Sequence, residues 1–115
     1  MKSDKINFIM KMIWKRINAQ KHEWLKIYKG ILLLEYLMLY GSKNIVAEAR
    51  DDTFEIRMLT NYLCFEDGIE KGRISLIVNN FLTFLVREKA KRILKMLQDE
   101  KYLEKERKNA EKTMY

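Results

Sequence analysis

The sequence of 115 residues contains no proline, one cysteine and one histidine. A single cysteine, Cys64, cannot form an intramolecular disulfide, and one cysteine with one histidine does not make up a zinc site. A membrane-spanning helix needs about 20 apolar residues. The two apolar runs, residues 31–40 and 74–86, are shorter than this. No charged-then-apolar signal segment opens the chain, so we expect a reducing compartment.

The sequence also lacks the short motifs that accompany common enzyme chemistry. It has no G-x-S-x-G, G-x-x-x-x-G-K-[ST] or G-x-G-x-x-G string. A dyad of Cys64 and His22 would need an orienting carboxylate and a pocket. The acidic pairs at residues 51–52 and 66–67 favour helix caps or solvent contacts. We therefore expect no catalytic residues, no metal and no cofactor.

Positive charge is concentrated in the first quarter of the chain. The whole sequence has a net charge of +7, and residues 1–30 carry eight basic and two acidic side chains, a net charge of +6. A cluster of one sign attracts phosphate, on lipid headgroups or on nucleic acid. The alternative is that these charges form a solvent-exposed face that only promotes solubility, and composition leaves both interpretations open.

Apolar side chains recur with helical spacing along most of the sequence. Isoleucines 6, 9, 13 and 17 mark a first amphipathic helix over residues 5–18. Further helices are predicted over residues 22–40, 43–51, 53–62 and about 75–112, the last as one long helix. Gly41 is expected to end the second helix in the left-handed conformation, and Ser42 to cap the third. Trp14 and Trp24 neighbour the isoleucine stripe and are predicted to belong to the core.

The second predicted helix is apolar on nearly every side. Between residues 31 and 39, Glu35 is its only charged residue. A helix of this kind must be covered by neighbours all round. We expect it to lie at the centre of a stack of helical hairpins, with the first and fourth helices as its covers.

Four sequence blocks, taken in order, resemble the ENTH domain of the epsins. They are MIWKRIN at residues 12–18, W-x-x-x-Y-K at residues 24–29, LLEYLMLYGS at residues 33–42, and VREKAK with LQDE between residues 86 and 100. Order and spacing agree up to about residue 72, and again from residue 86 to about residue 112. The resemblance implies an all-α superhelical stack of helical hairpins with a long C-terminal helix, in a single domain over residues 1–115.

The resemblance also implies a phosphoinositide-binding site on consecutive helices. Carried over residue by residue, its basic positions fall at Arg16, Lys21, His22 and Lys26, with Lys29 close behind. Arg16 can hold a phosphate through paired donors, whereas the lysines act as point charges. His22, at a helix start, is more often an exposed polar residue than a ligand. Four lysines and arginines contribute roughly 4 kcal/mol at an anionic surface, so we expect weak, about millimolar, lipid binding.

Two features differ from the family pattern. The chain starts where the family has already formed its N-terminal helices, and the apolar segment at residues 73–85 has no match. We expect this segment to extend the last helix, by about 16 Å for eleven residues. It would replace missing packing partners or join two copies of the chain through residues 74–86. A retained intron in the gene model is the alternative explanation.

In function, the resemblance implies a non-enzymatic adaptor module of clathrin-mediated vesicle trafficking and endocytosis. Expected partners are phosphoinositide headgroups, clathrin-coat and adaptor proteins. The expected location is cytoplasmic, peripheral at the plasma membrane, endosomes or trans-Golgi vesicles. One alternative is a helical module that binds protein cargo, such as a SNARE, without lipid. A nucleic-acid-binding domain is less favoured, because no Arg-rich recognition helix is present.

Overall fold

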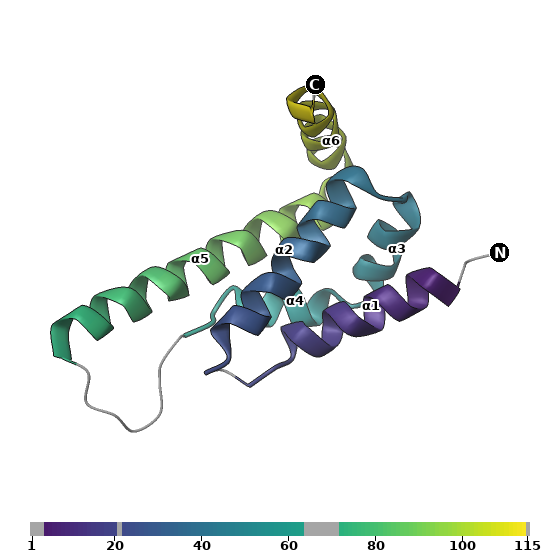
Figure 1. Cartoon of the computed structure of the whole chain (residues 1–115). Helices are drawn as coiled ribbons and strands as arrows, with labels where there is room; N and C mark the ends of the chain where they lie inside the picture. The colour runs from purple at the N-terminus through teal and green to yellow at the C-terminus, as the bar shows by residue number, and fades with distance from the viewer. Residues whose placement is uncertain (1–3, 21, 64–71, 115) are drawn as a thin grey trace.

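The computed structural model describes residues 4–20, 22–63 and 72–114, and these residues form α-helices and short links with no strand (Figure 1). The helices are α1 (Asp4–Ile17), α2 (Trp24–Tyr40), α3 (Lys43–Asp51), α4 (Thr53–Leu59), α5 (Gly72–Gln98) and α6 (Glu100–Met114). The predicted all-α fold is confirmed, and the first four helices lie within a few residues of their predicted bounds.

α1 is amphipathic, as its spacing of apolar residues predicts. Met10, Ile13 and Ile17 are at most 3% exposed, because residues three and four apart share one face of a helix. Trp14 is half-buried and packs against the same core, as does Trp24 at the start of α2. Both tryptophans therefore belong to the core, as predicted.

α2 is the central helix of the molecule. Its residues Ile27, Ile31, Leu34 and Met38 are at most 1% exposed. α1 packs against it, and so do α3, α5 and α6. The prediction that the fourth helix covers α2 is wrong, because α4 packs chiefly against α5. The cover comes instead from the C-terminal helices: α5 crosses α2 in Figure 1, and α6 also packs against it.

The end of α2 needs a glycine for a reason other than the predicted one. Gly41 has φ −97° and ψ −167°, an extended conformation, so the left-handed geometry is wrong. A Cβ at this position would lie 2.6 Å from the carbonyl oxygen of Leu37, which accepts the Gly41 N–H at 2.8 Å. The next prediction is confirmed: the Ser42 hydroxyl accepts a hydrogen bond from the backbone N–H of Asn44 at 3.0 Å and caps α3.

The predicted single C-terminal helix is instead two helices, α5 and α6, divided at Asp99. The side chain of Asp99 accepts a hydrogen bond from the backbone N–H of Tyr102 at 3.1 Å. Aspartate in this position satisfies one of the free N–H groups at the start of a helix. In Figure 1, α6 turns sharply away from the line of α5.

The break directs α6 onto the C-terminal end of α2. The guanidinium of Arg107 donates to the backbone carbonyls of Met38 and Gly41, which have no partner within the helix. The hydroxyl of Tyr40 in turn donates to the carbonyl of Ala110 at 3.4 Å. A cation at a helix C-terminus is stabilising, so these contacts explain why the chain bends and does not continue straight.

Removing the Asp99 cap should cost stability. We expect Asp99→Ala to lower the free energy of unfolding by about 1 kcal/mol, measured by urea denaturation. Asp52→Ala is the matched control, because Asp52 precedes α4 without making a side-chain capping hydrogen bond. Equal losses in the two variants would mean that the cap at Asp99 contributes nothing of its own.

The unmatched apolar segment is helical, as predicted, and forms the first half of α5. Side chains are described from residue 77 onward, and four of them are large, apolar and 46% to 66% exposed: Ile77, Val78, Phe81 and Phe84. In Figure 1 this half of α5 projects beyond the other helices. Association of two copies through residues 74–86 stays a prediction.

A partly buried charged network joins α2, α5 and α6. Glu35 on α2 is 7% exposed, and its carboxylate accepts hydrogen bonds from Lys89 at 2.9 and 3.0 Å and from Arg92. Arg92 also donates to Glu106 on α6, and this bond lowers the pKa of Glu106. The buried carboxylate of α2 is therefore neutralised by two cations on α5.

Candidate functional site

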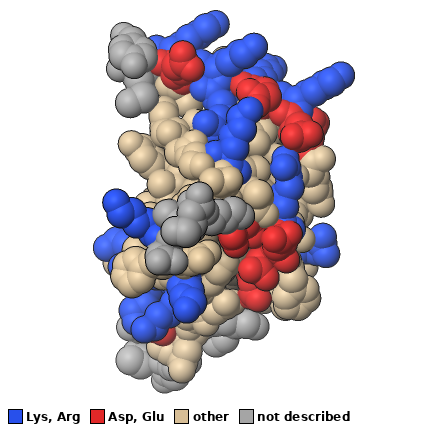
Figure 2. Space-filling model, turned by 90° about the vertical axis from the view of Figure 1, so that its right-hand side faces the viewer, with Lys and Arg blue, Asp and Glu red and all other residues tan. Residues whose placement is uncertain are grey.

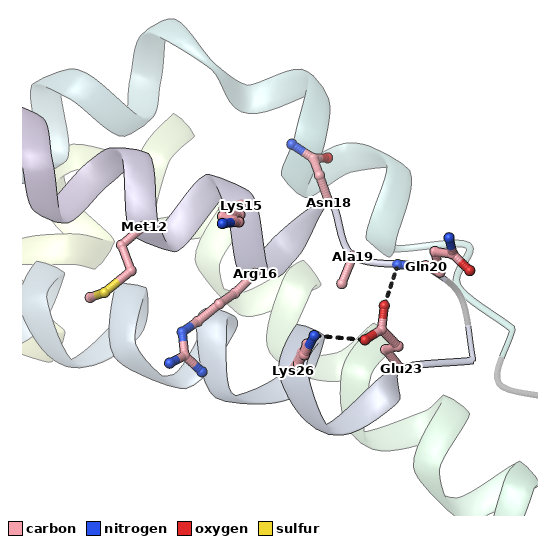
Figure 3. Close-up of a pocket in the computed structure, with 8 residues that line it drawn as sticks. All are labelled: Met12, Lys15, Arg16, Asn18, Ala19, Gln20, Glu23 and Lys26. Atoms are coloured by element: carbon pink, nitrogen blue, oxygen red, sulfur yellow. Dashed lines mark hydrogen bonds and ion pairs between the residues drawn. The ribbon is translucent and has the colours of Figure 1, made fainter.

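A groove of about 460 Å³ opens where α1 ends and α2 begins. Three basic side chains and one acidic side chain lie among its lining residues, which are Met12, Lys15, Arg16, Asn18, Ala19, Gln20, Glu23 and Lys26. Arg16 comes from the last turn of α1 and Lys26 from the first turn of α2. Figure 3 shows the two side chains on the same side of the helix pair.

The close approach of α1 and α2 depends on Gly30. A Cβ at this position would lie 2.9 Å from the Cβ of Arg16 and 3.3 Å from the backbone nitrogen of Ile17. With only a hydrogen there, the last turn of α1 lies directly against α2. The Arg16 side chain can then extend across the surface of α2 (Figure 3).

Glu23 contacts both the link between the two helices and one of the basic residues that line the groove. One carboxylate oxygen accepts the backbone N–H of Gln20 at 3.3 Å, and the other pairs with the ammonium of Lys26 at 2.8 Å. The hydrogen bond from Lys26 lowers the pKa of Glu23. Because the Lys26 side chain is 62% exposed, an incoming anion can reach it by replacing Glu23.

The structure brings together some of the predicted site residues. Arg16 and Lys26 line the groove. His22 lies in the link and Lys29 on α2; both are exposed and neither lines the groove. Lys21 lies outside the described residues.

Sequence reasoning missed Lys15 as a lining residue. Lys15 precedes Arg16 and lies across α1 from the buried Ile13 and Ile17. The helical periodicity that placed the isoleucines in the core could therefore have placed Lys15 on the exposed side beside the groove.

The groove is suited to a small anion that carries several phosphates. Its volume lies within the range of small-molecule sites, about 300 to 1,000 Å³. The Arg16 guanidinium offers paired donors to a phosphate, and the ammonium groups of Lys15 and Lys26 add point charges. Two cations from one helix end and one from the next helix start thus line one hollow.

The fold and this groove define a class of protein. The sequence matches the family model described as the ENTH domain over residues 1–103, so the chain belongs to the ENTH domain family. The resemblance inferred from the four sequence blocks is confirmed.

One relative and two solved structures show which members of the family this chain is similar to. The chain is 36% identical over 106 residues to "Epsin-2" of Homo sapiens, a match that covers 91% of this chain and 15% of that protein. Among solved structures, it is similar to "The ENTH domain from epsin-2 in complex with phosphatidylinositol 4,5-bisphosphate (PIP2)", with a TM-score of 0.73, 27% identity, and coverage of 93% and 68% of the two chains. It is also similar to the "Structure of the endocytic adaptor complex AENTH", with a TM-score of 0.72, 29% identity, and coverage of 93% and 67%.

None of the helices in residues 4–20, 22–63 and 72–114 is both long enough and apolar enough to cross a bilayer.

Proposed function

We propose that this chain is a phosphoinositide-binding module of a membrane-trafficking adaptor, and that the groove between α1 and α2 receives the headgroup. The observation that carries the proposal is that Arg16 and Lys26, from consecutive helices, line one groove. The headgroup phosphates would accept hydrogen bonds from Arg16 and displace Glu23 from Lys26. No chemical reaction is part of this function.

The relatives support this assignment. One similar solved structure is the ENTH domain of epsin-2 in complex with phosphatidylinositol 4,5-bisphosphate. Another is an endocytic adaptor complex. By this analogy the module acts at a cytosolic membrane surface and contacts adaptor proteins of an endocytic coat. Clathrin, a SNARE cargo and a particular organelle stay predictions.

Arginine 16 provides the direct test. We expect Arg16→Ala to weaken binding to vesicles of phosphatidylcholine with phosphatidylinositol 4,5-bisphosphate about tenfold, because it removes the paired donors to one phosphate. The measurement is cosedimentation at physiological salt, with circular dichroism to confirm that the variant is folded.

Arg57→Ala is the matched control for charge. Arg57 is an exposed arginine on α4 and does not line the groove, so its removal lowers the net charge equally. If both variants lose the same affinity, binding depends on overall charge and the groove has no special role. If Arg16→Ala retains full vesicle binding, the cargo-binding alternative without lipid gains support.

A further inference from the structure

The outer face of α1 combines two apolar side chains with lysines. Phe8 is 69% exposed and Met12 is 37% exposed. Helical spacing places Lys11 and Lys15 on one side of this apolar pair and Lys5 on the other. These five residues, called here the outer face of α1, lie opposite the buried isoleucines. No acidic residue occurs between residues 5 and 20.

This face is continuous with the candidate headgroup groove. A second hollow of about 310 Å³ is lined by Phe8, Lys11, Met12 and Lys15. Met12 and Lys15 line the groove as well. One connected surface therefore runs from Phe8 along α1 to the groove, and a flat partner that reaches the groove also meets Phe8.

The charge pattern favours a lipid surface as that partner. Figure 2 shows lysine and arginine side chains gathered at the top, where α6 lies, and again at the height at which Figure 1 shows α1. On α1 the lysines flank apolar groups, the arrangement of helices that lie in a membrane interface. Lysine stems can follow apolar groups into the interface while the ammonium groups stay near phosphates. An anionic bilayer offers both the negative surface and the apolar interior that these residues match.

We propose that the outer face of α1 is a second membrane contact, in which Phe8 and Met12 enter the headgroup region of an anionic bilayer beside the lysines. The inference rests on the proposed function, because the groove brings this face to the membrane. Electrostatic attraction alone gives weak binding, and stable attachment needs a second signal such as an inserted apolar face. Phe8 and Met12 supply that second signal from within the folded domain.

Serine substitution tests the contact. We expect Phe8→Ser to weaken cosedimentation with vesicles of phosphatidylcholine, phosphatidylserine and phosphatidylinositol 4,5-bisphosphate about tenfold. Lys11→Ala should weaken it about fivefold, and this loss should shrink at high salt. Phe81→Ser is the matched control, because Phe81 is 59% exposed on α5, whose first half projects at the other end of the molecule from the start of α1 (Figure 1). Its binding should equal that of the unaltered chain.

Insertion has a readout of its own. A tryptophan in Phe8→Trp should be quenched by lipids brominated on their acyl chains, over and above the quenching of Trp14 and Trp24 in the unaltered chain. Phe81→Trp should show no such increase. Equal quenching in the two variants would overturn the assignment of insertion to α1.

The remaining outcomes separate this inference from the proposed function. If Arg16→Ala weakens binding and Phe8→Ser does not, the groove stands and the second contact is wrong. If Phe8→Ser weakens binding to phosphatidylserine vesicles while phosphatidylinositol 4,5-bisphosphate adds nothing, the second contact stands and the groove proposal fails. If light scattering shows a dimer that Phe8→Ser converts to a monomer, a second copy occupies this face and the lipid contact is overturned.

Discussion

Replacing Glu35 with alanine is expected to lower the free energy of unfolding by about 3 kcal/mol. Removal of one partner from a buried ion pair leaves an uncompensated charge, which costs about 3 to 5 kcal/mol. The lower end applies here because the side chains of Lys89 and Arg92 are 32% and 31% exposed, so water takes over part of their solvation. Urea denaturation followed by circular dichroism measures the loss.

Glu104→Ala gives the comparison for a surface pair. Glu104 is 52% exposed and lies 3.6 Å from Lys43, and exposed pairs contribute about 0 to 1 kcal/mol. Glu35→Gln keeps the shape and removes the charge, so its loss of free energy of unfolding should lie between those of Glu35→Ala and Glu104→Ala. If Glu35→Ala and Glu104→Ala lower the free energy of unfolding by the same small amount, the ion pairs of Glu35 stabilise the fold no more than an exposed pair does.

Gly30→Val is expected to lower the free energy of unfolding by about 3 kcal/mol and also to weaken headgroup binding. Even the first added carbon would lie 2.9 Å from the Cβ of Arg16 and 3.2 Å from a side-chain carbon of Ile17. Overpacking of this kind costs about 1 to 3 kcal/mol, and valine adds two further methyl groups. Because the helices must separate, Arg16 moves away from the groove. Thermal unfolding and vesicle cosedimentation measure the two effects.

Two variants isolate the cause. Ala47→Val places a valine at an exposed position of α3, where only the lower helix propensity applies, a few tenths of a kcal/mol. Gly30→Ala gains about 1 kcal/mol of helix propensity against its steric cost, so its net change should be far smaller than that of valine. An unchanged melting temperature for Gly30→Val would contradict the close helix crossing.

Local sequence patterns predicted the parts of the fold that depend on local physics. The isoleucine spacing of α1 indicates its buried face, and Ser42 indicates the start of α3. The all-round apolar character of α2 places it at the centre. In each case the information lies within a single helix or at its end, since capping and amphipathicity are properties of nearby positions.

Other features depend on contacts between residues far apart in the sequence, and local patterns did not reveal them. The helix pattern runs through Asp99 without a proline or glycine, and the break is stabilised by Arg107 on the end of α2, more than 60 residues earlier. The same reason applies to Glu35, whose partners Lys89 and Arg92 lie on α5. Such pairings require the packed arrangement itself.

The candidate site was partly predictable. Charge distribution indicated an anion partner in the first 30 residues, and the family resemblance selected Arg16 and Lys26. Neither indicated that Lys26 already forms an ion pair with Glu23, because that pairing depends on how the link folds. Helical spacing places Phe8 opposite the isoleucines, but the continuity of its surface with the groove depends on how α1 packs.

The separation in sequence of these contacts sets an order for folding. Arg16 and Lys26 are ten residues apart, so the groove can form as soon as α1 and α2 pair. The remaining side of α2 waits for residues such as Lys89 and Ala110, which lie 54 and 70 residues from their partners, and closing longer loops costs more entropy and slows folding. During synthesis, the N-terminal hairpin therefore leaves the ribosome with its most apolar helix half uncovered, a state in which chaperones bind and aggregation starts.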